Sequence, residues 1–158
     1  MSTSNELREL RQRAAARASS LNLPYAGALS PAEAYAFWQA TSEARLVDVR
    51  TRAEWDWVGR IQNALEIEWL RYPSNERNPD FLAQLQAQVD PSAPVLFLCR
   101  SGARSHQAAL LAQAAGYQQC FNVLEGFEGD KDNSAEGSGL GQRGKLNGWR
   151  HAGLPWYS

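Results

Sequence analysis

The strongest indication of the fold is an unbroken apolar run that leads into a short turn and then into a helix-forming segment. Residues 94–98 read PVLFL, residues 99–104 read CRSGAR, and an alanine-rich stretch follows up to Gly116. A strand that is apolar on both faces is typical of the centre of a parallel sheet covered by helices on both sides. A glycine just after the last helical residue is a common helix end. The sequence therefore predicts a strand, a turn and a helix over 103–115 at the centre of an α/β domain.

Further helices and strands alternate along the chain. Ser30, Pro31 and Glu33 predict the start of a helix, because a serine cap, a proline in the first turn and a glutamate three residues after the cap form a capping box. The other predicted strands are 46–49, 64–67 and 120–124, and the other predicted helical segments are 5–19, 51–57 and one opened by Pro79 and Asp80. This alternation favours a mostly parallel sheet.

The length of 158 residues favours one domain. We expect a polar helical extension at residues 1–22, which packs at the domain edge or frays, and the domain itself at 23–158. Residues 128–148 are rich in glycine and show no periodicity, which predicts a mobile loop inserted in the domain. The strand before this loop ends at the same sheet edge as Cys99, so the loop is expected to lean over that residue as a partial lid.

Charge and composition argue against several classes of partner. The formal net charge is −1, and no apolar run approaches the ~18 residues of a membrane-spanning helix. Nucleic acid and anionic membranes are therefore not expected as partners. The N-terminal segment lacks the apolar stretch of an export signal, so the cytoplasm is the expected compartment. Its arginines and serines are typical of an organelle transit peptide, but Glu6 and Glu9 count against one.

The two cysteines do not predict a disulfide framework or a zinc site, because neither has a second cysteine or a histidine at ligand spacing. Cys120 has the apolar neighbours Phe121, Val123 and Leu124 in the predicted strand, which favours core packing. The acidic segment 130–136 is similar to the start of a calcium loop. However, Ala135 stands where that loop needs glycine and Gly141 where it needs glutamate, so no metal is expected.

Cys99 is the candidate nucleophile. It follows the apolar strand at its carboxyl end, the edge of an open parallel sheet where ligands bind. The turn can aim several backbone N–H groups at one point, and the following helix adds the positive end of its dipole. These groups and two arginines favour a thiolate over a thiol. The residues expected to bind the substrate are Arg100, Ser101, Gly102, Ala103 and Arg104.

Three side chains near the predicted site each have two possible roles. Arg104 either binds the substrate or braces the turn by pairing with a carboxylate. His106 follows on the helix and could act as a base, but a surface histidine is the commoner case. The same interpretation applies to His151.

Four stretches make the chain resemble a single-domain rhodanese, a thiosulfate sulfurtransferase-type domain. They span about residues 28–156. They are LVDVRTRAEW at 46–55, VGRIQNA at 58–64, CRSGAR at 99–104, and the closing motif NVLEGF at 122–127 with GWRHAGLP at 148–155. The resemblance implies a three-layer α/β domain with a central, mostly parallel sheet of about five strands flanked by helices.

The resemblance also implies a double displacement through a persulfide on Cys99, with sulfur taken from thiosulfate or a similar donor and passed to cyanide or a thiol. A protein can also serve as sulfur acceptor. Neither half-reaction requires a metal or an organic cofactor. Asp48, Arg50 and Glu54 are expected to form a structural ion-pair set beside the site.

The sequence departs from the family pattern at three places. Arg60 stands where the family usually has histidine, and Asn63 where it often has glycine. The third departure is the insert between Phe127 and Trp149, where the family's connection is usually short.

Two other functions compete with sulfur transfer. Phosphatases and arsenate reductases of the same fold resemble this chain, but their loops have five residues between cysteine and arginine, and here there are four. A non-catalytic rhodanese-like module that binds another protein often lacks the cysteine, although the long insert would suit docking. The oligomeric state stays open, as does the choice among thiosulfate, glutathione persulfide and a protein-bound persulfide as donor.

Overall fold

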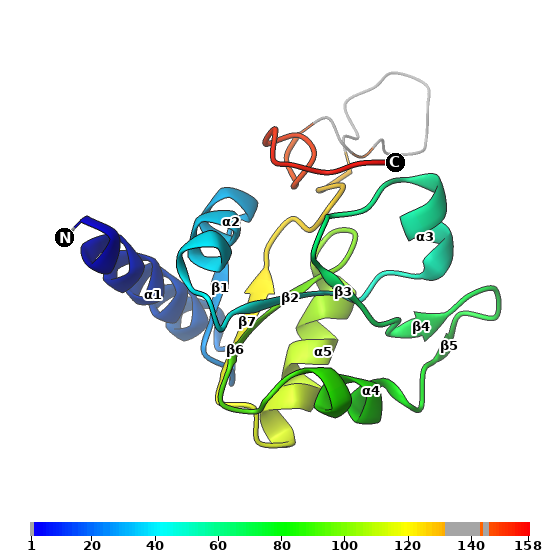
Figure 1. The fold of residues 1–158 in the computed structure, drawn as a ribbon, viewed down its shortest axis with the longest axis horizontal. Helices are drawn as coiled ribbons and strands as arrows, with labels where there is room; N and C mark the ends of the chain where they lie inside the picture. The colour runs from blue at the N-terminus through cyan, green and yellow to red at the C-terminus, as the bar shows by residue number, and fades with distance from the viewer. Residues whose placement is uncertain (1, 132–142, 144–145) are drawn as a thin grey trace.

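Five short parallel strands form the centre of the molecule, in the order β1-β7-β6-β2-β3 (Figure 1). The structure is a computed structural model and describes residues 2–131, 143 and 146–158. The strands are β1 (Gly27–Leu29), β2 (Arg45–Asp48), β3 (Leu65–Glu66), β6 (Pro94–Leu98) and β7 (Gln119–Val123). The apolar run at 94–98 is the middle strand, buried at every position, which confirms the expected central strand.

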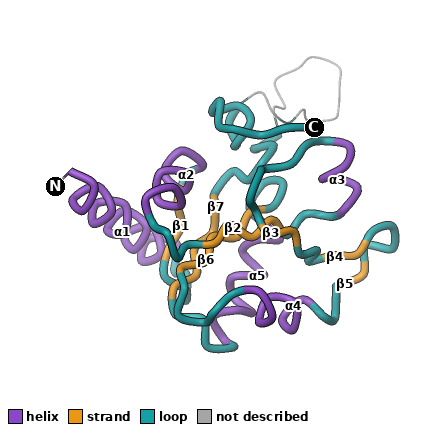
Figure 2. The backbone as a smooth tube through the Cα atoms, viewed as in Figure 1, coloured by secondary structure: helices purple, strands orange, loops and turns teal. Residues whose placement is uncertain are grey.

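Helices cover both faces of this sheet, as Figure 2 shows (purple). They are α1 (Ser2–Leu21), α2 (Pro31–Ala40), α3 (Arg52–Trp57), α4 (Phe81–Gln88) and α5 (Ala103–Ala114). Residues of β6 alternate between two apolar clusters: Val95 and Phe97 pack with α4 and α5, while Leu96 and Leu98 pack with α1 and α2. The expected α/β fold, a mostly parallel sheet of about five strands flanked by helices, is therefore confirmed.

Two capping boxes begin helices α2 and α3. The Ser30 hydroxyl accepts a hydrogen bond from the backbone N–H of Glu33, whose carboxylate accepts from the backbone N–H of Ser30. Thr51 and Glu54 repeat the arrangement at the start of α3. Each box satisfies two backbone N–H groups that a helix start leaves without partners. The predicted helix start at Ser30 and the predicted turn at 51–57 are confirmed.

Helix α1 packs directly on the edge strand β1. A Cβ atom on Gly27 would lie 2.5 Å from the carbonyl oxygen of Ala14, so only glycine permits this approach of helix to strand. Arg17 on the same helix forms an ion pair with Glu33 and a hydrogen bond of 3.1 Å to the carbonyl of Ala28.

Three short elements were not expected from the sequence. Strand β1 has three residues, and a separate antiparallel pair joins β4 (Leu70–Arg71) to β5 (Glu76–Arg77). Elements of two or three residues are too short to show a hydrophobic period. Within the described part of the chain, no helix is long and apolar enough to cross a membrane.

Most of the predicted insert, residues 132–142 and 144–145, lies outside the described residues. The expectation of a mobile lid over Cys99 falls on this segment. Its base is described: Asn147 accepts a hydrogen bond of 2.8 Å from the backbone N–H of Asp130. A Cβ on Gly129 would lie 2.1 Å from the carbonyl oxygen of Asn147, so the two backbone segments touch there.

Candidate active site

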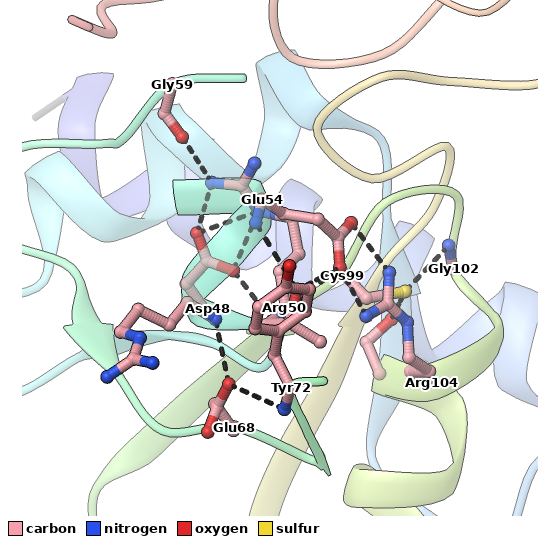
Figure 3. Close-up of polar contacts among 12 residues, drawn as sticks. Asp48, Arg50, Glu54, Gly59, Glu68, Tyr72, Cys99, Gly102 and Arg104 are labelled. Carbon is pink, nitrogen blue, oxygen red and sulfur yellow. Dashed lines mark hydrogen bonds and ion pairs between the residues drawn. The ribbon is translucent and has the colours of Figure 1, made fainter. Parts of the chain in front are cut away.

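Cys99 follows the last residue of β6 and is 1% exposed (Figure 3). The backbone N–H of Gly102 donates a hydrogen bond of 3.1 Å to its sulfur, Sγ, and Oγ of Ser105 lies 3.3 Å from the same atom. Gly102 has φ 112°, a conformation that glycine adopts without strain. Helix α5 begins directly after this turn, so the N–H groups of its first turn have no partner within the helix.

The closing motif at 122–127 and the residue after it hold the backbone of the turn at 99–104. The backbone N–H of Phe127 donates to the carbonyl of Cys99 at 2.8 Å, and that of Glu128 donates to the carbonyl of Arg100 at 2.9 Å. A Cβ on Gly126, which has φ +62°, would lie 2.5 Å from the Cys99 carbonyl oxygen. The glycine of this motif is therefore required by contact with the backbone of the active-site turn.

Arg104 braces the turn through a carboxylate. Its two terminal nitrogens donate to the two oxygens of Glu54 at 2.6 and 2.9 Å. Burial opposes ionisation of Glu54, but the hydrogen bonds and charge of Arg104, with the N–H of Thr51, hold its pKa below the ordinary value. Bracing was one of the two roles that the sequence left open for Arg104. Contact with substrate stays a prediction.

Asp48 and Arg50 form a second, fully buried ion pair. Arg50 donates from its Nε and Nη2 to the Asp48 carboxylate at 2.7 to 3.1 Å, and from Nη2 to the carbonyl of Gly59 at 2.8 Å. Its guanidinium carbon lies 4.1 Å from the centre of the Phe127 ring, which favours a cation–π contact. The expected set of three residues therefore divides into two pairs, because Glu54 pairs with Arg104.

The remaining turn residues differ in exposure. Arg100 and Ala103 are exposed, whereas Ser101 is half-buried. The Arg100 carbonyl also accepts a hydrogen bond of 3.2 Å from Gly129, so its backbone is fixed while its side chain is exposed to solvent. Substrate binding by these residues stays a prediction.

His106 is half-buried rather than on the open surface, and its Nδ1 lies 2.6 Å from the hydroxyl of Tyr25. Burial raises the pKa of Tyr25 to about 12. His151 is exposed. Cys120 is 1% exposed, and burial raises the pKa of its thiol to about 12. It therefore stays protonated at neutral pH, in keeping with the core role expected for it.

Sequence reasoning missed two polar residues behind Cys99. Ser105 is fully buried and its Oγ lies 2.5 Å from Oδ1 of Asn122 on β7. The signal for Asn122 was an amide side chain within a strand of otherwise apolar residues. A buried amide must find hydrogen-bond partners, and here they lie in the active-site turn.

Two departures from the family pattern have local explanations. Asn63 has φ 72°, a left-handed conformation that suits both asparagine and the glycine usual there. Arg60 pairs with Asp56 and, at 2.9 Å, with Glu66. Its backbone N–H also donates to the carbonyl of Tyr157 at 2.7 Å, which joins this segment to the end of the chain.

Comparisons with known proteins agree with this arrangement. A family model described as "Rhodanese-like domain" matches residues 30–133. The uncharacterized protein RP600 of Rickettsia prowazekii is 34% identical over 127 residues, which cover 78% of this chain and 91% of that protein. The crystal structure of Rv0390 from M. tuberculosis has a TM-score of 0.73 and 40% identity, covering 84% of this chain and 97% of that chain. Thiosulfate sulfurtransferase 18 of Arabidopsis thaliana is 38% identical over 58 residues, 37% of this chain and 43% of that protein.

Proposed function

This chain belongs to the family of rhodanese-like domains, and we propose that it is a sulfurtransferase in which Cys99 carries the transferred sulfur as a persulfide. The observation that carries the proposal is the hydrogen bond from the Gly102 N–H to Sγ of Cys99 in a turn that is braced on two sides. Arg104 is tied to Glu54, and the carbonyl of Cys99 is tied to Phe127. Such a turn holds the sulfur atom in a fixed position against the N–H of Gly102.

In the first half-reaction the Cys99 thiolate attacks the outer sulfur of thiosulfate or a similar donor. The sulfur–sulfur bond of the donor breaks, and sulfite leaves with the bonding electron pair. Cys99 then carries an outer sulfur with one negative charge. In the second half-reaction cyanide or a thiolate attacks that outer sulfur, forms thiocyanate or a new persulfide, and returns the Cys99 thiolate. The total charge and the number of sulfur atoms are the same before and after each step, and neither step needs an added oxidant. This is nucleophilic catalysis by an activated thiolate.

The charges around the turn support an anionic sulfur donor. Arg104 is balanced by Glu54, and Arg50 by Asp48. The exposed guanidinium of Arg100 and the N-terminus of α5 remain to attract a dianion and to stabilise the outer sulfur of the persulfide. The partners of this reaction are therefore a small anionic donor and a thiol, cyanide or protein acceptor.

Intact mass measurement tests the proposal directly. The reduced protein is incubated with thiosulfate, freed of excess donor and weighed without reductant. We expect a gain of one sulfur atom, located on Cys99 by peptide mapping and removed by cyanide. Cys120→Ser should load in the same way, because the Cys120 thiol is buried and protonated. Cys99→Ser should not load.

Other outcomes separate the alternatives. A mass unchanged by both thiosulfate and glutathione persulfide would overturn sulfur transfer. Turnover of an aryl phosphate without sulfur loading would favour the phosphatase alternative, and neither activity would favour an interaction module.

A further inference from the structure

Four polar contacts link the Cys99 sulfur, the backbone of Gly102 and the side chains of Asn122 and Ser105 into a closed ring. Gly102 donates to Sγ through its N–H at 3.1 Å, and its carbonyl accepts from Nδ2 of Asn122 at 3.2 Å. Oδ1 of Asn122 lies 2.5 Å from Oγ of Ser105, and that Oγ lies 3.3 Å from Sγ. Ser105 is 0% and Asn122 is 5% exposed, so bulk water has little access to the ring.

Two oxygen atoms in this ring can only accept hydrogen bonds, and they determine where its hydrogen atoms lie. A backbone carbonyl only accepts, so the nitrogen of the Asn122 amide must face Gly102. The amide oxygen then faces Ser105, and it only accepts as well. The single hydroxyl hydrogen of Ser105 is therefore directed to Asn122. What Ser105 turns towards Sγ is an oxygen lone pair.

This arrangement affects the charge states of Cys99 differently. A neutral thiol can donate its S–H to Ser105. A thiolate receives the hydrogen bond from Gly102 but faces the lone pair of Ser105, so Ser105 gives the anion no hydrogen bond. In a persulfide the negative charge lies on the outer sulfur, and Sγ is neutral. Sulfur loading therefore relieves an unfavourable contact between the thiolate and the Ser105 oxygen.

We propose that Asn122 is a positioning residue for sulfur transfer, acting on Cys99 through Ser105 and Gly102. Its amide oxygen holds the Ser105 hydrogen away from Sγ, and its amide nitrogen holds the carbonyl of Gly102, the residue whose N–H points at Sγ. The role in transfer rests on the proposed function, because it requires Cys99 to react as a thiolate.

Several charged and titratable groups surround the ring, and among them Arg100 is exposed to solvent while His106 contacts the hydroxyl of Tyr25. Arg104 on α5 pairs with Glu54 on α3, and Arg50 pairs with Asp48 at the end of β2. Tyr25 neighbours Asn122. Burial raises its pKa to about 12, against a lowering by the Asn122 amide, so it is neutral at physiological pH.

The pH dependence of Cys99 alkylation by iodoacetamide tests the direction of these hydrogen bonds. All proteins carry Cys120→Ser, and the set is the parent, Ser105→Ala, Asn122→Leu and the double variant. Leucine is larger than asparagine but is branched at the same carbon, and it lacks both the amide oxygen and the amide nitrogen. We expect Asn122→Leu to lower the alkylation midpoint by about one pH unit, because the freed Ser105 hydroxyl then donates to the thiolate. At a pH well above both midpoints, where both proteins are fully thiolate, its single-turnover sulfur loading should fall about threefold for each pH unit of that decrease.

The other variants provide the controls. Ser105→Ala should leave the midpoint unchanged or lower it, because the hydroxyl gives no hydrogen to Sγ in the parent. The double variant should lose the decrease seen with Asn122→Leu. His106→Gln should leave the midpoint unchanged, because the His106 side chain bonds to Tyr25 outside the ring, and the backbone N–H of residue 106, which donates to the Gly102 carbonyl at 3.2 Å, is kept.

Any rise of the midpoint in Ser105→Ala would show that Ser105 already donates to Sγ, and would overturn the proposal. A midpoint that rises in Asn122→Leu would show that the amide only holds the turn in place. Ser105→Ala decides the matter even if Asn122→Leu does not fold, since it removes one buried oxygen. Alkylation needs no sulfur donor, so a parent with the expected alkylation pattern that never loads sulfur would refute the proposed function and leave the hydrogen-bond directions standing.

Discussion

Replacing Glu54 by glutamine should weaken the brace on the active-site turn. The carboxylate accepts two hydrogen bonds from Arg104, at 2.6 and 2.9 Å, and the two side chains are only 17% and 19% exposed. Glutamine keeps the size of the side chain but loses the charge and one acceptor. Hydrogen bonds to charged groups contribute about 1.5–3 kcal/mol, so we expect Glu54→Gln to lower the free energy of unfolding by about 2 kcal/mol at pH 7.

The effect should depend on pH with a definite sign. Burial alone would raise the pKa of Glu54, but Arg104 and the Thr51 N–H hold it below the ordinary value of 4.5. A carboxyl group with a lower pKa in the folded state stabilises the fold above its unfolded pKa, and this contribution is lost as pH falls through the folded pKa. The difference between the parent and Glu54→Gln should therefore be complete above about pH 5 and shrink below it.

Urea unfolding followed by tryptophan fluorescence at several pH values measures both effects. In thermal unfolding a loss of about 2 kcal/mol corresponds to about 4–8 °C for a domain of this size. Glu76→Gln is the control, because Glu76 is exposed on the short strand β5. A loss below about 0.5 kcal/mol at pH 7, the level of an ordinary surface substitution, would refute the brace. So would a loss that is the same at pH 7 and in acid.

Three further predictions concern the same turn. Arg100→Ala should raise KM for thiosulfate more than it lowers kcat, because an exposed cation mainly binds the dianion in the ground state; an unchanged KM would place Arg100 outside the site. Gly126→Ala should unfold or strongly destabilise the protein, because its Cβ would lie 2.5 Å from the Cys99 carbonyl oxygen. The control Gly116→Ala has φ +104° but nothing within 4 Å of the new Cβ, so it should cost only the backbone strain of about 1–2 kcal/mol. Equal melting temperatures of the two variants would contradict this. In a thiocyanate assay with thiosulfate and cyanide, Cys99→Ser should abolish activity and Cys120→Ser should keep most of it, so equal losses would exclude a single catalytic thiol.

The sequence was most informative where one pattern determines both local structure and burial. The apolar run at 94–98 favoured a buried central strand, and the capping box at Ser30 satisfies its own backbone, so both were predictable without knowledge of distant residues. The partners of the site depend on contacts across the fold. Glu54 lies 50 residues from Arg104, and Asn122 lies 17 residues from Ser105. The packing of α3 and β7 around the turn determines that Arg104 pairs with Glu54 and that Asn122 faces Ser105. Neither contact follows from local sequence.

The contact between Gly129 and Asn147 has a consequence for the evolution and engineering of this domain. Because the two backbone segments already touch, the chain between them begins and ends at nearly the same point of the domain. The entropy of closing such a loop rises slowly, by about 0.6 kcal/mol for each doubling of its length. Sequence can therefore be added at this junction at little expense to the stability of the sheet. A new binding segment can therefore be inserted between Gly129 and Asn147 without a change in the active-site turn.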